Sequence, residues 1–429
     1  METKQMAMRA RQAAYEMANL NAGIRNAALM GIADALDRNS QALFEANRTD
    51  LVRSQADGLA TSLLKRLKFD QEKLSEVVSG LHSLVGLPDP IGRTQLATRL
   101  DAGLELYRVS CPIGVIGVIF ESRPDALVQI SGLAVKSGNA ILLKGGSEAM
   151  ETNRLLAKVI NEAGCQFGLP DGWIGLMETR EAVGQLLAMD DEIDLLIPRG
   201  SNEFVRYIMD NTRIPVLGHA DGVCHLYIDR ACDPEMAITV AMDSKTQYVA
   251  VCNAVETILI HSALSEKLLP ELAKALRDAG VQIYGCQRTC AAINCDPVSD
   301  WHTEYLDCQV SIRLVDSADE AIEHINRYGS GHTEAIVTAQ EETARHFLSH
   351  VDSGNVFWNC STRFSDGFRY GFGAEVGIST SKIHARGPVG LDGLMTYQYR
   401  LLGHGQIVGE YAGGQKKFIH EPIDRDYPL

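Results

Sequence analysis

From Pro112 onward, short apolar runs alternate with longer stretches of helical pattern, and this rhythm limits the possible fold more than any other feature. The apolar runs span residues 115–120, 140–144, 173–177, 194–197, 214–217 and 225–229, and helical stretches such as 148–163 and 202–211 lie between them. Strands that alternate with helices are typical of a doubly wound sheet of parallel strands. The sequence therefore predicts an α/β domain in this part of the chain.

A second series of the same kind begins near Asp233. It comprises a helix, the strand that follows Cys252, a helix over 264–279, and strands over 310–315, 334–338 and 355–358. A chain of 429 residues is long enough for two or three domains. Two α/β domains in one chain leave a cleft between them, where ligands usually bind.

Three segments do not follow this rhythm. Residues 1–90 carry apolar stripes at helical spacing, up to the turn Leu87-Pro-Asp-Pro90, and predict a helical section. Residues 104–109 and 397–401 each have the pattern of an isolated, exposed strand, which suits an arm better than a core.

Composition argues against several classes of protein. The net charge of -15 is opposite to that of a nucleic-acid surface. No run has the roughly 18 apolar residues of a membrane span, and the N-terminus lacks the apolar core of a signal peptide. We expect a cytoplasmic protein whose 10 cysteines stay reduced. The cluster Cys286, Cys290, Cys295 and Cys308 contains no C-x-x-C pair and no His at zinc-finger spacing, so no metal site is expected.

Cys252 is the candidate nucleophile. It precedes the apolar run Val255–Ile260, so its thiol would lie at the entrance to a rigid strand and could face a cleft. Taken alone, a cysteine in such a position is more often a small buried apolar residue. Asp221, Glu256, Glu304 and His219 are candidate bases, but none has a spacing that by itself pairs it with Cys252.

Several turns could hold phosphate or an oxyanion, although neither common nucleotide fingerprint is present. Lys144-Gly145-Gly146-Ser147 and Arg199-Gly200-Ser201 each join a strand to a helix, where free backbone N–H groups suit phosphate oxygens. Lys144 could reach a ribose hydroxyl. Two further turns, Ser122-Arg123-Pro124 and Ser361-Thr-Arg363, place an arginine directly after a strand. All of these residues are also common in ordinary loops.

Long motifs in the C-terminal half and around these turns resemble the γ-glutamyl phosphate reductases, a family within the aldehyde dehydrogenase superfamily. The motifs are Cys111–Pro124, Lys136–Glu148, Asp194–Ser201, His219–His225, Asn326–Glu334 and Gly371–Thr380. The resemblance runs from the first helix to about Gly405.

This resemblance implies an aldehyde dehydrogenase-like α/β fold with two doubly wound parallel-sheet domains and a small β oligomerisation arm. A cofactor-binding domain would cover residues 1–230, with 101–111 contributing to the arm. A catalytic domain with Cys252 as the nucleophile would cover 231–373, and residues 374–395 would return to the cofactor domain. Residues 396–429 would form the arm and tail, which implies a homo-oligomer, either a dimer or a tetramer.

The resemblance also implies a reaction, in which NADPH reduces L-glutamyl 5-phosphate to L-glutamate 5-semialdehyde and phosphate, the second step of proline biosynthesis. Cys252 would attack the acyl phosphate, and the thioester would accept hydride. The backbone N–H of Cys252 and the Ser122-Arg123 turn would hold the oxyanion. A glutamate kinase, if it is a partner, would be a separate chain.

Further site residues follow from matching positions. Lys144, Gly145, Gly146, Ser147, Arg199, Gly200 and Ser201 would contact the cofactor, and Glu304 would match the glutamate that holds the nicotinamide ribose. Ser147 stands where relatives that prefer NAD carry an acid, which favours NADPH. Lys245, Asn253 and Arg363 are expected to bind the substrate or its phosphate.

One departure favours release of phosphate over hydrolysis. Hydrolytic aldehyde dehydrogenases activate water with a Glu, but the matching stretch here, Pro215–Gly222, contains none. Two alternatives remain open: another acylating or hydrolytic aldehyde dehydrogenase, or a non-catalytic protein of the same fold.

Overall fold

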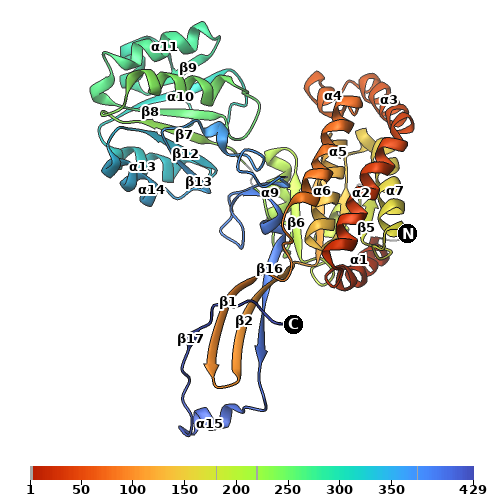
Figure 1. Cartoon of the computed structure of the whole chain (residues 1–429). Coiled ribbons are helices and arrows are strands. Elements are labelled where there is room, and N and C mark those ends of the chain that lie inside the picture. Colours follow the sequence, from red (N-terminus) through yellow and green to blue (C-terminus); the bar gives the residue numbers. More distant parts are fainter. Residues whose placement is uncertain (1–2, 180, 219–220, 374) are drawn as a thin grey trace.

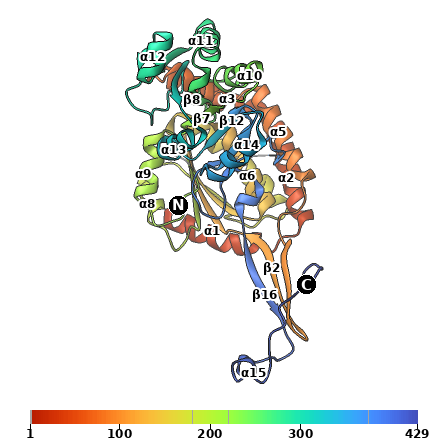
Figure 2. The same cartoon turned by 90° about the vertical axis from the view of Figure 1, so that its left-hand side faces the viewer.

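The computed structural model describes residues 3–179, 181–218, 221–373 and 375–429. Two α/β parts lie beside each other, and a long β arm projects away from both (Figures 1 and 2). Each α/β part has its own apolar core, so the two parts are separate domains in the physical sense.

The first α/β part combines the N-terminal helices with a four-stranded parallel sheet of order β5-β4-β3-β6. Its elements are α1 Thr3–Met17, α2 Ala22–Arg38, α3 Ser40–Ala56, α4 Thr61–Leu67, α5 Gln71–Gly86, β3 Val115–Phe120, α6 Pro124–Ser137, β4 Ala140–Lys144, α7 Met150–Gln166, β5 Ile174–Met177, α8 Glu181–Leu187, β6 Leu195–Arg199 and α9 Asn202–Asp210. Every residue of β3 and β4 is buried, as expected for parallel strands covered on both faces.

The second α/β part is a seven-stranded parallel sheet of order β10-β9-β11-β8-β7-β12-β13. Its elements are β7 Cys224–Ile228, α10 Pro234–Thr246, β8 Val255–His261, α11 Leu268–Asp278, β9 Gln282–Gly285, α12 Gln287–Ile293, β10 Asp296–Pro297, β11 Gln309–Val315, α13 Ala318–Tyr328, β12 Thr333–Val337, α14 Glu341–His350 and β13 Asn355–Trp358. Helices α10 and α11 lie on one face, and α13 and α14 lie on the other (Figure 1).

The arm is an antiparallel sheet of order β16-β2-β1-β17. Its strands are β1 Thr94–Asp101, β2 Leu104–Pro112, β16 Met395–Leu402 and β17 Glu421–Pro422, and the short helix α15 Val408–Ala412 lies at its tip. Segments from both ends of the chain therefore meet in the arm. On β16, Tyr397, Tyr399 and Leu401 are exposed by 48%, 59% and 56%.

After β13 the chain runs back to the first core. The short strands β14 Gly377–Ser379 and β15 Gly387–Val389 pair antiparallel, and a 3-10 helix, η4 Leu391–Leu394, leads into β16. Val376, Val389, Leu391 and Leu394 belong to the core of the first part. This return segment therefore ties the second part and the arm to the first.

Three sequence-based expectations differ from the structure. Residues 214–217 form no strand, because only one bridge, between Val216 and Leu196, extends the sheet there, next to Pro215, which has no N–H. The run near 225–229 is β7, which pairs with β8 and β12, so the change of sheet occurs before β7 and not at residue 230. Strand β1 was not expected, because its polar, partly exposed residues give little apolar alternation.

Among the residues that the structure describes, every helix is too short or too polar to cross a membrane.

Candidate active site

Cys252 lies in a cleft of about 700 Å³ that both α/β parts line. The first part supplies the β3–α6 loop with Glu121, Ser122 and Arg123, and the β6–α9 loop from Arg199 to Asn202. These loops follow neighbouring strands, so they meet at the carboxyl edge of the sheet, where α/β proteins bind ligands. Helix α9 lies between the two parts (Figure 1).

Residues just before and at the start of β7 pack closely against the backbone of Cys252. A Cβ on Gly222 would lie 2.4 Å from the Cys252 carbonyl oxygen and 2.6 Å from its Cα and Cβ, so no other residue fits there. The thiol of buried Cys224 donates to the same carbonyl over 3.1 Å. On the next residue, the hydroxyl of Thr362 donates to the Asn253 carbonyl over 2.7 Å. The position of Cys252, the candidate nucleophile, is therefore fixed by its neighbours, as a catalytic group would require.

Two guanidinium groups interact electrostatically with the Cys252 sulfur. Desolvation lowers the pKa of Arg199, and the negative charge on Cys252 opposes that effect. Desolvation likewise lowers the pKa of Arg363, and Cys252 again raises it. The thiolate is the form of cysteine that acts as a nucleophile, and both arginines bring positive charge close to this sulfur.

Ser122 lines the cleft, but its donors are engaged elsewhere. Its backbone N–H and its hydroxyl both donate to one carboxylate oxygen of Glu148, over 2.6 and 2.8 Å. Ser122 is 5% exposed, and its φ of 47° is rare for a residue with a side chain. The turn is thus built to hold an anionic oxygen, but in this structure that oxygen belongs to Glu148 and not to a group near Cys252. Arg123 lines the cleft beside it.

The two glycine turns predicted to hold a cofactor lie at the same edge of the sheet. Arg199, Gly200 and Ser201 line the cleft, and Ser201 precedes α9 without capping it by its side chain. Burial raises the pKa of Glu121, and a hydrogen bond from the Ser201 N–H opposes the rise. On the other turn, the Lys144 ammonium donates to the Gly145 carbonyl.

The second turn is closely packed. A Cβ on Gly145 would lie 2.2 Å from the side chain of Asn153, and one on Gly146 would lie 2.0 Å from the Glu148 carboxylate. A larger residue at either position would therefore have to displace the Asn153 or Glu148 side chain. Ser147 next to them is exposed. Glu304 comes from the second α/β part and accepts a hydrogen bond of 2.6 Å from Asn202, at the start of α9. The structure thus brings Glu304 beside the Arg199–Ser201 turn.

Lys245 does not face the cleft, contrary to the expectation from sequence. It is fully buried and pairs with Glu256 over 2.7 Å. Burial raises the pKa of Glu256 to about 7, and Lys245 limits the rise. The expectation rested only on the closeness of Lys245 to Cys252 in sequence. In the fold, the Lys245 ammonium group faces Glu256 and forms an ion pair with it. Lys245 is therefore a structural residue, and Glu256 is not free to act as a base.

Substitution Lys245→Met should lower the free energy of unfolding by about 3–5 kcal/mol, because it leaves the Glu256 carboxylate buried without its cation. Urea unfolding of the variant and the wild type measures this difference. Lys274→Met is the matched control, since Lys274 pairs with Asp278 at the surface. Equal, small effects of the two substitutions would contradict the structural role given to Lys245.

The other predicted substrate residues, Asn253 and Arg363, lie near Cys252, but their side chains already have hydrogen-bond partners. Asn253 donates to the Ser365 carbonyl over 2.7 Å, and Arg363 donates through Nε to Gln247 over 2.9 Å. Asp221, a candidate base, pairs with Arg206 over 2.5 Å. His219 lies outside the described residues. Sequence reasoning missed Gly222 and Cys224, which contact the Cys252 backbone, and Arg66, which lines the cleft. These placements depend on contacts between distant segments.

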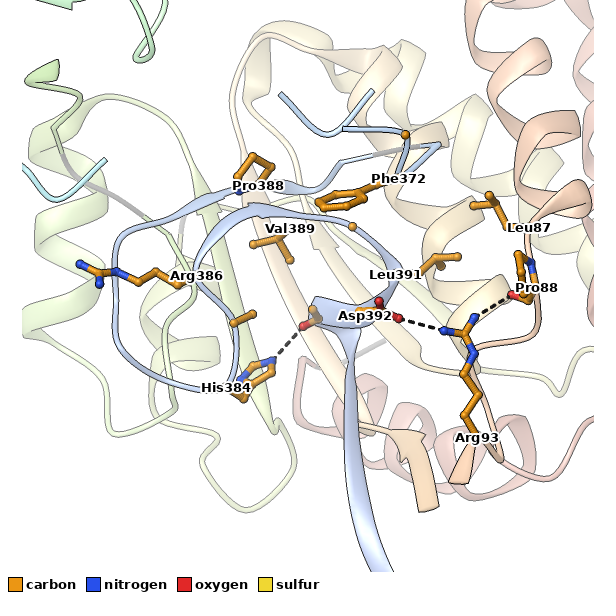
Figure 3. A pocket seen from close by; sticks show the side chains of 14 residues that line it. Leu87, Pro88, Arg93, Phe372, His384, Arg386, Pro388, Val389, Leu391 and Asp392 are labelled. Carbon is orange, nitrogen blue, oxygen red and sulfur yellow. Dashed lines mark hydrogen bonds and ion pairs between the residues drawn. The ribbon is translucent and has the colours of Figure 1, made fainter. Parts of the chain in front are cut away.

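A second cavity, of about 490 Å³, lies at the root of the arm (Figure 3). Several of its polar groups already have partners: Arg93 donates to Asp392 and to the Pro88 carbonyl, and His384 contacts the Gly393 carbonyl. Arg386 pairs with Asp352 over 2.8 Å. The residues that line it include no cysteine. The cleft at Cys252 is therefore the candidate active site. Among the described residues, no three His, Cys, Asp or Glu side chains converge to hold a metal ion.

Comparison with known proteins shows the family of this chain. The model of the aldehyde dehydrogenase family matches residues 1–283 and 302–398. A γ-glutamyl phosphate reductase from Pelotomaculum thermopropionicum is 61% identical over 431 residues, covering 100% of this chain and 99% of that protein. The chain belongs to the γ-glutamyl phosphate reductase family of aldehyde dehydrogenases.

Solved structures agree with this family assignment. A γ-glutamyl phosphate reductase from Thermotoga maritima superimposes with a TM-score of 0.93 at 37% identity, over 95% of this chain and 100% of that one. A glyceraldehyde-3-phosphate dehydrogenase from Methanocaldococcus jannaschii, complexed with NADP, has a TM-score of 0.65 at 15% identity, over 94% of both chains. The second likeness shows the fold alone, and both support an aldehyde dehydrogenase fold for this chain.

Proposed function

We propose that this protein reduces L-glutamyl 5-phosphate to L-glutamate 5-semialdehyde with NADPH and releases phosphate, as the second step of proline biosynthesis. The observation that carries the proposal is the position of Cys252 in a cleft with Arg66, Arg123 and Arg199, in a chain that is similar over its whole length to γ-glutamyl phosphate reductases. Arginines suit a phosphate leaving group, because the guanidinium fork matches phosphate oxygens.

Cys252 performs the covalent chemistry. Its thiolate attacks the acyl carbon, the bond from that carbon to the phosphate oxygen breaks, and a thioester forms on Cys252. The cofactor, when bound, supplies the hydride that reduces this thioester. The resulting tetrahedral oxyanion then collapses, the C–S bond breaks, and Cys252 leaves as the thiolate. An oxyanion therefore arises twice, and the Cys252 N–H and the Ser122-Arg123 turn are the donors proposed for it. For Ser122 this requires that Glu148 moves away.

The residues of the cleft fit a nicotinamide cofactor. The N-terminus of α9 opens onto the cleft at Gly200 and Ser201, where anionic oxygens are favoured. Glu304 lies at the same place and offers a carboxylate to ribose hydroxyls. Lys144, Gly145, Gly146 and Ser147 are proposed for the adenosine end.

A preference for NADPH is supported by the charge around Ser147. Ser147 carries no negative charge, and Arg53 on α3 donates to the carbonyls of Ser147 and Glu148 over 3.0 and 3.3 Å. Arg53 also pairs with Asp50, which is buried and accepts the Thr152 N–H at the start of α7. Arg53 is thus held in place beside the turn, where a 2′-phosphate would meet its charge.

Substitution Arg53→Gln should raise KM for NADPH about tenfold and leave KM for NADH nearly unchanged, because one charge-assisted hydrogen bond is lost only with the phosphorylated cofactor. Steady-state kinetics with both cofactors measures this. Arg48→Gln, at an exposed position of the same helix, is the control. A parallel rise for NADH would contradict a contact of Arg53 with the 2′-phosphate.

The proposed acyl partner is phosphate and not water. The stretch Pro215–Gly222 contains no Glu, and Glu256, the glutamate near Cys252 in sequence, is paired with Lys245. The test is the reverse reaction, with semialdehyde and NADP. Turnover should require phosphate, and activity that is independent of phosphate would overturn the proposal in favour of a hydrolytic aldehyde dehydrogenase. Absence of any turnover would favour the non-catalytic alternative.

We further propose a homo-oligomer, a dimer or a tetramer, that acts in the cytoplasm, where thiols stay reduced. A glutamate kinase on a separate chain, which would supply the acyl phosphate, is the proposed partner. The exposed apolar residues of β16 support assembly through the arm, because such residues normally mark an interface.

The double substitution Tyr399→Glu with Leu401→Glu should therefore shift the protein to the monomer, since it places charge on the exposed edge strand of the arm. Light scattering after size-exclusion chromatography measures the mass. Val52→Glu replaces an equally exposed apolar residue on α3 and is the control. An unchanged mass for the double variant would exclude β16 from the interface.

A further inference from the structure

Two cysteines outside the active-site cleft lie in direct contact. Helix α12 connects β9 to β10 at the edge of the second sheet, and it carries Cys290, while Cys295 follows its end. The two sulfur atoms are 3.3 Å apart, and the Cys295 thiol donates to the Cys290 sulfur. Both side chains are partly accessible to solvent.

The surrounding chain is shaped to bring these sulfurs together. Gly285 at the end of β9 leaves the space for them, since a Cβ there would lie 2.7 Å from the Cys295 sulfur. Between the two cysteines, Asn294 has a φ of 47°, so the chain turns sharply and places Cys295 back against the helix. The Cys290 sulfur also lies 3.4 Å from the carbonyls of Gly285 and Asp296.

A metal site does not account for the pair. No group of three or more metal-ligating side chains was found in the described part of the chain, and the nearest oxygens are backbone carbonyls. Thiolate sites for zinc need about four ligands. The pair also lies in residues 284–301, the gap between the two ranges that the aldehyde dehydrogenase family model matches. Its chemistry is therefore separate from that of the shared fold.

We propose that Cys290 and Cys295 are a redox-active thiol pair that closes to an intramolecular disulfide when the protein meets a peroxide. A disulfide needs the sulfurs at about 2.05 Å, so closure requires an approach of only about 1 Å. The turn at Asn294 allows that approach with little movement of the sheet.

The reaction balances with peroxide as the oxidant. Burial and the hydrogen bond to Cys290 raise the pKa of Cys295 to about 12, so Cys290 is the attacking sulfur. Cys290 attacks one peroxide oxygen, the O–O bond breaks, and a sulfenic acid and one water form. The Cys295 sulfur then attacks the Cys290 sulfur, the S–O bond breaks, and a second water leaves with the thiol proton. Two thiols lose two electrons, and one peroxide is reduced to two waters.

Mass spectrometry tests the proposal directly. The full-length protein, with Cys252→Ala to remove the nucleophile, is treated with one equivalent of hydrogen peroxide, alkylated and digested with trypsin. No Lys or Arg lies between Arg288 and Arg313, so one peptide holds Cys290, Cys295 and Cys308. This peptide should be about 2 Da lighter than its thiol form, with only exposed Cys308 alkylated.

A variant separates the pair from general thiol oxidation. Cys295→Ser should abolish the loss of 2 Da and leave a sulfenic acid at Cys290, which dimedone traps, whereas Cys308→Ser should leave the disulfide unchanged. Alkylation of both Cys290 and Cys295 after peroxide treatment would overturn the proposal, as would a disulfide from Cys290 to Cys286 or to Cys308.

Discussion

Replacement of Cys252 by Ala should reduce the rate of NADPH-dependent reduction by at least ~10⁴-fold, because the variant has no sulfur to form the acyl intermediate. Cys252 is the only thiol among the residues that line the cleft, so within that described lining no second nucleophile can replace it. The methyl group of Ala is smaller than the thiol side chain, and the backbone contacts to Gly222 and Cys224 do not depend on the sulfur.

The fold and cofactor binding should therefore survive this substitution. Circular dichroism and a fluorescence titration with NADPH check both properties on the same sample. Cys308→Ala, at an exposed position away from the cleft, is the matched control and should keep full activity. Turnover by Cys252→Ala within tenfold of the wild type would refute the assignment of Cys252 as the nucleophile.

Replacement of Gly222 by Ala should lower kcat by roughly 10²-fold, because the added methyl group pushes directly on the nucleophile's backbone. The Cβ would meet the Cys252 carbonyl oxygen at 2.4 Å, far inside van der Waals contact, and one of the two segments has to move. The φ of Gly222 is not in the left-handed region, so the effect comes from this contact and not from backbone strain. KM for the cofactor should change little, since Gly222 does not line the cleft.

Kinetics and thermal unfolding separate displacement of the thiol from loss of the fold. Overpacking should cost about 1–3 kcal/mol of stability, which leaves a domain of this size folded. Gly184→Ala is the control, because a Cβ on Gly184 has no heavy atom within 4 Å and it lies in helix α8. Equal kcat values for Gly222→Ala and Gly184→Ala would show that this contact does not position Cys252.

The sequence predicts the buried strands well and the pairing of strands poorly. Residues 115–120, 140–144 and 355–358 are strands β3, β4 and β13 with the expected bounds, because strands in a parallel sheet are short, continuous apolar runs. The sheet to which β7 belongs depends on contacts with β12, about 110 residues further along the chain, which no local pattern contains. Strand β17 of the arm was missed for the same reason, because its partner β1 lies far away in sequence, whereas β1 was missed because its residues show little apolar alternation.

In the candidate site, too, features set by local sequence were predicted, and features set by contacts between distant segments were not. The turns with Ser122, Arg123 and Arg199 were predicted from residues after strands, and the parallel sheet brings them to the cleft with Cys252. Lys245 was misassigned, because its environment is decided by Glu256 on the facing strand. The hydrogen bonds from Ser122 to Glu148 were also not predicted, because they form only where two separate loops meet and no local sequence pattern indicates them.

The central claim is that Cys252 carries an acyl group that only phosphate removes, and a single-turnover experiment with semialdehyde and NADP in the absence of phosphate tests it most directly. The account predicts a burst of one NADPH per active site, an acyl group located on Cys252 by mass spectrometry, and continued turnover once phosphate is added. Steady NADPH formation without phosphate, or an acyl group on any residue other than Cys252, would contradict it.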